Sequence, residues 1–134
     1  MIRLRAEIKE GMEDFVVNSS AELERTLALA ESQARAAGKL NVIFLRAANG
    51  DRLSVVVGGA ETVLGFTYGH GDPPYYASTG DTEADQPVLT AFVGLAHHTE
   101  FPRRYVVPME NGRQAAAQFL QTGDRPAAVQ WVAT

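Results

Sequence analysis

Three apolar runs near the middle of the chain follow one another with very short connections, which leaves few ways to fold this region. Leu40 to Ala47 and Leu53 to Val57 are rich in β-branched and aromatic residues, as strands usually are. Between them lies Asn49-Gly50, a strong hairpin signal because both residues tolerate a positive φ. Gly58-Gly59 permits another turn into a third run, Thr62 to Tyr68. The pattern predicts a meander of adjacent strands.

The segment between Ser19 and Gly38 predicts an amphipathic helix. Ser19 and Glu22 have the spacing of a capping box, and Gly38 is a natural helix stop. Apolar residues at spacings of three or four form one stripe: Leu23, Leu27, Ala30, Ala34 and Ala37. The predicted polar face carries the charged residues Glu24, Glu31 and Arg35.

A second helix is predicted to start at Pro108, because the missing N–H of proline does no harm in a first turn. It runs to about Gln121, with Gly123 as its stop. The residues expected to face inward are Ala115, Ala116, Phe119 and Leu120.

The remaining segments complete a single α+β domain over residues 1–134. Alternation from Ile2 to Ile8 predicts a strand, and residues 87–94 predict another near the centre of the sheet. Residues 69–86 predict a long loop or broken hairpin, residues 97–104 a turn, and residues 128–132 a last short strand. The expected order is β-α-β-β-β-β-α-β, a mostly antiparallel sheet with two helices packed against one face.

Composition narrows the possible functions. The chain has no cysteine, which excludes disulfides, thiolate zinc sites and cysteine nucleophiles. We expect neither a signal peptide nor a spanning helix, because the charged N-terminal segment contains no continuous apolar run. The cytoplasm is therefore the expected location. The net charge of −4 argues against nucleic acid or an anionic membrane as a partner and leaves a basic protein open.

The sequence contains no positive signal for catalysis. His70, together with His97 or His98 and with Asp72 or Glu100, could in principle form a two-histidine, one-carboxylate metal site. No metal-binding spacing supports it, and adjacent histidines on an extended segment point to opposite sides. Nucleophile-elbow and phosphate-loop motifs are missing as well. We therefore expect a protein that is not an enzyme and that uses no metal and no cofactor.

Charge is distributed unevenly along the chain. Residues 53–102 contain no lysine or arginine but six acidic residues, among aromatic residues that include Tyr75 and Tyr76. Acidic groups around aromatic anchors suit recognition of a basic surface. A solvated acidic loop whose tyrosines cover the core explains the same composition equally well.

A set of motifs lies mainly in the C-terminal half: residues 64–68, residues 74–81, His97-His98-Thr99-Glu100-Phe101-Pro102, Val107-Pro108, Ala115-Ala116, Phe119-Leu120, Gly123-Asp124-Arg125-Pro126 and Val129-Gln130-Trp131. Together they resemble a bacterial immunity-protein family, the one called immunity protein one, found beside polymorphic-toxin genes and notably beside those ending in nucleic-acid deaminase domains. Residues 1–57 are similar in layout only.

The resemblance implies an immunity protein that binds a cognate toxin one to one and neutralises it. A deaminase toxin must admit a polyanionic strand into a basic groove, and an acidic protein could compete there by presenting carboxylates in place of phosphates. Combined with the charge distribution, it predicts that most toxin contacts come from Asp72, Tyr75, Tyr76, Asp81, Glu83, Asp85, His98 and Glu100.

Two alternatives stay open at this point. One is a small-molecule binding or regulatory domain, with a pocket between the sheet and the segment of residues 69–86. The other is a hydrolase that uses the histidine–carboxylate metal site described above.

Overall fold

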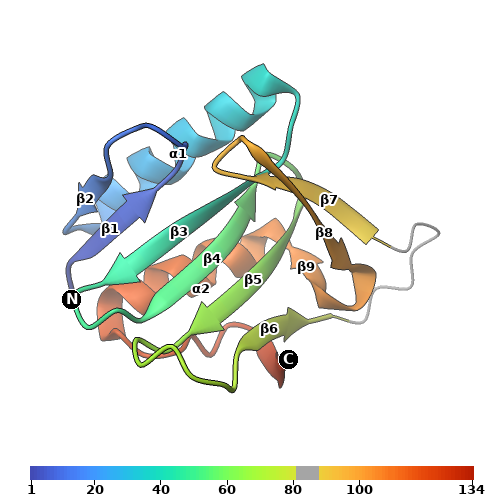
Figure 1. Cartoon of the computed structure of the whole chain (residues 1–134). Coiled ribbons are helices and arrows are strands. Elements are labelled where there is room, and N and C mark those ends of the chain that lie inside the picture. Colours follow the sequence, from blue (N-terminus) through green and yellow to red (C-terminus); the bar gives the residue numbers. More distant parts are fainter. Residues whose placement is uncertain (81–87) are drawn as a thin grey trace.

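Figure 1 shows the computed structural model, which describes residues 1–80 and 88–134. The helices are α1 (Ser20–Ala37) and α2 (Met109–Thr122), and a short 3-10 turn, η1, covers Arg103–Tyr105. The strands are β1 (Leu4–Glu7), β2 (Phe15–Val17), β3 (Asn41–Ala47), β4 (Arg52–Val57), β5 (Glu61–Thr67), β6 (Tyr76–Thr79), β7 (Val88–Val93), β8 (His97–Pro102), β9 (Val106–Pro108) and β10 (Gln130–Ala133).

The strands form a mostly antiparallel sheet with the order β10-β6-β5-β4-β3-β1-β2, which confirms the α+β prediction. The predicted meander is its centre: β3 pairs with β4, and β4 with β5, all antiparallel. The hairpin turn predicted at Asn49-Gly50 connects β3 and β4, with a positive φ at Gly50 (91°) but not at Asn49. The C-terminal half of β3 pairs with β1 on its other edge.

Both helices cover one face of the sheet, where the main core lies (Figure 1). Alternate strand residues such as Leu45 and Leu53 point into this core together with Phe119 of α2. Three predicted helix ends are confirmed, because Ser19 accepts a hydrogen bond from the Glu22 N–H and both stop glycines, Gly38 and Gly123, have a positive φ. Pro108 precedes the first turn of α2 as its N-cap and is the last residue of β9.

Two details of the first helix differ from the prediction. Ala37 is exposed, so the buried stripe ends at Ala34. Glu31, predicted on the polar face, is only 7% exposed. It lies beside α2, where Arg113 Nη2 is 2.6 Å from its Oε1, without the angles of a hydrogen bond. The periodicity of one helix cannot show where a second helix will pack.

The β7–β8 hairpin lies over the other face of the sheet, in front of β3, β4 and β5 in Figure 1. It covers a second, smaller core that contains Val42, Val56, Val63, Ala91 and Val106. The prediction that residues 87–94 lie near the centre of the sheet is therefore wrong. β7 pairs with β3 in parallel at only two positions, and its main partner is β8.

Residues 97–102 form a strand and not the predicted turn. The turn lies earlier, at Gly94 and Leu95, which have φ values of 60° and 59°. β8 was hidden by its composition, because its outer face is solvated and carries polar side chains. The inner face of the hairpin includes Phe101, which packs against the smaller core.

The predicted order also omitted short strands. β2 pairs with β1 at one edge of the sheet, and β9 pairs with β5. β6 lies within the segment predicted as a loop or broken hairpin, and pairs with β5 and β10. Each has three or four residues, too few for a periodic pattern. The described part of the chain holds no helix long and apolar enough to cross a membrane.

Candidate interaction site

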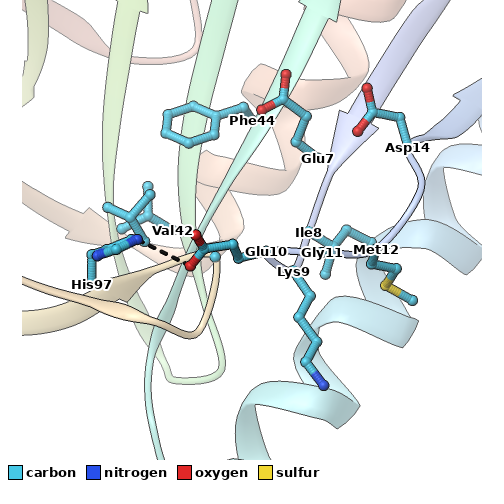
Figure 2. A pocket seen from close by; sticks show the side chains of 12 residues that line it. Glu7, Ile8, Lys9, Glu10, Gly11, Met12, Asp14, Val42, Phe44 and His97 are labelled. Atoms are coloured by element: carbon cyan, nitrogen blue, oxygen red, sulfur yellow. Dashed lines mark ion pairs between the residues drawn. The ribbon is translucent and has the colours of Figure 1, made fainter.

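A cleft of about 330 Å³ opens between the β1–β2 loop, strand β3 and the tip of the β7–β8 hairpin (Figure 2). Its apolar part comes from Val42 and Phe44 of β3 and from Val93 of β7. Its polar part includes the carboxylates of Glu7, Glu10 and Asp14, together with His97 and Lys9.

Asn41 holds the two sides of this cleft together. Its side chain is fully buried. The Nδ2 group donates to the carbonyl of Ile8 at 2.7 Å, and Oδ1 accepts from the N–H of Leu95 at 3.0 Å. The Glu10 N–H also donates to the carbonyl of Gly94 at 3.0 Å. The end of β1 and the hairpin tip are therefore joined, which fixes the carboxylates of the loop relative to β8.

The carboxylates lie on different sides of the cleft. Glu7 accepts two hydrogen bonds from Arg46, at 2.9 and 3.1 Å, and Glu10 pairs with Nε2 of His97 at 3.0 Å. In Figure 2 the carboxylates of Glu7 and Asp14 point the same way, whereas the ammonium of Lys9 points away from them. The side chains of Glu10 and His97 are 62% and 70% exposed, so this pair is open to exchange with a ligand.

This arrangement suits binding of a basic side chain. An arginine or lysine has an apolar stem that can lie on Val42 and Phe44 and a cationic head that carboxylates can hold. Among the described residues, no group of three histidine or carboxylate side chains is placed to hold a metal ion. The histidines lie apart: His97 contacts Glu10, His98 contacts Glu100, and His70 stacks on Tyr68.

The predicted residues His98 and Glu100 lie on the outer face of β8, away from the sheet. His98 Nε2 is 3.7 Å from Glu100 Oε1, and its ring packs edge-on against Phe92 at 5.6 Å. Lys39 Nζ lies 4.6 Å from the centre of that same phenylalanine ring. Both predicted side chains are more than half exposed. They are available to a partner beside the cleft, because β8 begins at His97.

The predicted residues Asp72, Tyr75 and Tyr76 lie at the other end of the sheet. Their segment is attached to the β3–β4 turn, where the Gly69 N–H donates to Asp51. Asp72 and Tyr75 are exposed. Tyr76 is half-buried against the main core, with the guanidinium of Arg125 4.1 Å from its ring centre.

The length of β3 separates these two groups of predicted residues. The His97 end lies at the start of β3 and the Asp72 end beyond its last residue, which is roughly 20 Å at 3.3 Å per residue. The other predicted contacts, Asp81, Glu83 and Asp85, lie outside the described residues.

Sequence reasoning missed Glu7, Glu10 and Asp14 as candidates. The toxin contacts were predicted from the charge distribution, which points to residues 53–102, the part without lysine or arginine. A signal was available in the acidic run from Glu10 to Asp14, directly after the first strand. These carboxylates line a cleft only because the tip of the β7–β8 hairpin, more than eighty residues further along the chain, packs beside them.

A family model described as Immunity protein Imm1 matches residues 11–133. No curated protein matches the chain.

Proposed function

The chain belongs to the Imm1 family of immunity proteins, and we propose that it neutralises a nucleic-acid deaminase toxin by covering its basic substrate groove. A deaminase must bring a polyanionic strand into such a groove and place one base beside its zinc-bound water. Carboxylates presented at the groove compete with the phosphates for the same cations. In this proposal the immunity protein acts in the cytoplasm, one molecule per toxin, without catalysis, cofactor or nucleic acid of its own.

One observation carries the proposal: the cleft presents carboxylates around an apolar floor, and the adjoining strand β8 presents another on its outer face. We call Glu7, Glu10, Asp14 and Glu100 the carboxylate surface. Glu10, Asp14 and Glu100 are all exposed. A groove that binds phosphates has arginine or lysine side chains along it, and the cleft has room for one of them.

The residues predicted from the sequence remain part of the proposed contact set. A standard interface covers about 800 Å² per partner, equivalent to a disc roughly 30 Å across. One toxin could therefore touch both the His98–Glu100 end and the Asp72–Tyr75 end. Tyr75, which is 41% exposed, is the best aromatic anchor among the described residues of this set.

Binding to the toxin domain encoded beside the gene of this chain tests the proposal. The variant Glu10→Gln/Asp14→Asn/Glu100→Gln should bind that domain about 100-fold more weakly in calorimetry, because three groups that face its cations lose their charge. The matched control is Glu24→Gln/Glu110→Gln/Asp124→Asn, which neutralises three exposed carboxylates elsewhere. Binding by the control should stay within threefold of wild type.

Two results would contradict this proposal. If the control variant loses affinity and the first variant does not, the interface includes the helices or the segment directly after α2. If the toxin domain releases no ammonia from single-stranded DNA or RNA, it is not a deaminase. Growth of cells that co-express the toxin with each variant should follow the same ranking as the affinities.

A further inference from the structure

Three arginines stand in register on the sheet face that the helices leave uncovered. Arg5 of β1 lies directly opposite Arg46 of β3, and Arg46 lies directly opposite Arg52 of β4. Their chain neighbours Leu45 and Leu53 are fully buried toward the helices, so the arginines point the other way. We call these three residues the arginine row.

Such a row is unfavourable for the fold on its own. Neighbouring strands are about 4.8 Å apart, and like charges directly opposite each other destabilise a sheet. Across the described residues only Arg46 of the three forms an ion pair, with Glu7. Arg52 lies on the ring of Phe44, 4.5 Å from its centre, and Arg5 is exposed. Among the described residues, Glu7 is therefore the one carboxylate in an ion pair with these three arginines.

The local electrostatics agree with this excess of positive charge. Burial lowers the pKa of Arg52 from its ordinary value, the charge of Arg46 lowers this pKa further, and Glu7 offsets part of the change. Arginine nevertheless keeps its charge at physiological pH. Water and salt screen part of this excess, because Arg5 is exposed and Arg52 is only partly buried, and an anion from a partner can neutralise the rest.

We propose that the arginine row binds an acidic segment of the same toxin, as a second contact beside the carboxylate surface. This inference rests on the proposed function. The row spans two strand intervals, about 10 Å. Carboxylates one turn apart on a helix are about 6 Å apart, so a short acidic segment can meet two or three guanidinium groups, each able to bind a carboxylate through two hydrogen bonds.

The surroundings of the row favour an acidic protein segment over a nucleic acid. Phe44, which lies two residues from Arg46 on the same face of β3, also lines the cleft, whose Glu7, Glu10 and Asp14 repel phosphates. A phosphate backbone extending past the row toward the cleft would meet these carboxylates. A protein surface can instead alternate its charges, with acidic side chains on the row and a basic side chain in the cleft. This pairing of opposite patches sets one orientation of the complex.

The variant Arg5→Gln/Arg52→Gln tests the inference and leaves Arg46 as the partner of Glu7. Its Kd for the toxin domain should rise about 30-fold, because two charge-assisted contacts are lost. The variant Arg5→Lys/Arg52→Lys keeps the two charges but loses the forked geometry of the guanidinium groups. Its Kd for the toxin domain should lie between that of wild type and that of Arg5→Gln/Arg52→Gln. The control Arg25→Gln removes an exposed charge from α1 and should bind as wild type does.

A stability measurement separates this role from a structural one. Removing like charges from the sheet should leave the Tm of Arg5→Gln/Arg52→Gln equal to or above that of wild type, while its toxin binding falls. A double-mutant cycle against carboxylates of the toxin should show coupling to Arg5 or Arg52.

The outcomes are distinguishable. If wild type binds the toxin and the variant binds equally well, the inference is wrong and the proposed function stands. If wild type does not bind the toxin, both are wrong. If a fluorescent single-stranded oligonucleotide binds wild type and not the variant, the row is a nucleic-acid site. If the variant abolishes self-association seen in sedimentation, the occupant is a second copy of this chain.

Discussion

At the scale of single residues, Asn41 shows how one buried amide can organise a surface cleft. The side chain has no solvent exposure, and it connects the carbonyl of Ile8 to the N–H of Leu95. These two backbone groups belong to the end of β1 and to the hairpin tip. An amide is suited to this position because it offers a donor and an acceptor at once.

The variant Asn41→Ala should therefore destabilise the protein by about 2 to 4 kcal/mol, since two backbone groups lose their partner in a buried place. Asn41→Asp should be at least as damaging at neutral pH, because a carboxylate cannot donate to Ile8 and buries a charge. Urea unfolding followed by circular dichroism gives both values. The exposed Gln114→Ala is the control, and equal stability of Asn41→Ala would show that water replaces the amide.

The range of an interaction along the chain decides whether the sequence can predict it. The capping box of Ser19 and Glu22 spans three residues, and the sequence predicts it correctly. The partners of Asn41 lie 33 and 54 residues away, so its role cannot be seen without the fold. For the same reason the carboxylates of the cleft could not be joined to His97 from the sequence.

At the scale of elements, the contact between the two helices depends on a buried charge. Glu31 of α1 lies 2.6 Å from Arg113 of α2 and 3.7 Å from Arg35 on its own helix. The side chain of Arg113 is 45% exposed and that of Arg35 63%, so water screens both. The carboxylate itself is almost fully buried and depends on these cations.

The variant Arg113→Ala should lower the free energy of unfolding by about 1 to 2 kcal/mol, less than a fully buried pair would lose, because the arginine is partly solvated. Glu31→Gln/Arg113→Ala should recover part of this loss, since the buried charge is then removed as well. Glu24→Gln on the exposed side of α1 is the control. A double variant no more stable than Arg113→Ala would mean that the arginine acts by packing alone.

Some strands of this protein can be predicted from the sequence pattern, and others, such as β8, cannot. The meander and both helices were predictable because hairpin turns and amphipathic stripes are local signals. β8 was not, since its outer side chains, His98 and Glu100, make it look like a loop. Its placement over Val42 depends on the smaller core, to which β3, β4, β5, β7 and β9 all contribute.

At the scale of the whole molecule, both signs of charge lie on the same side of the sheet. A count along the chain finds the cations concentrated outside residues 53–102. Strand register brings Arg5, Arg46 and Arg52 together, and the β1–β2 loop brings carboxylates beside them. Net charge alone therefore describes the protein poorly, and the position of each charge decides how a partner approaches.

The kinetics of toxin binding can show whether net charge or the position of the charges guides the toxin. If the carboxylate surface guides encounter, the association rate constant of wild type should fall about tenfold as ionic strength rises from about 0.01 M to about 0.15 M, because the screening length shrinks from about 30 Å to about 8 Å. Glu10→Gln/Asp14→Asn/Glu100→Gln should flatten this dependence. Glu24→Gln/Glu110→Gln/Asp124→Asn should keep it, although each variant loses three carboxylates and changes the net charge from −4 to −1. Stopped-flow fluorescence gives the rates, and equal slopes for the two variants would mean that net charge, not its placement, guides the toxin.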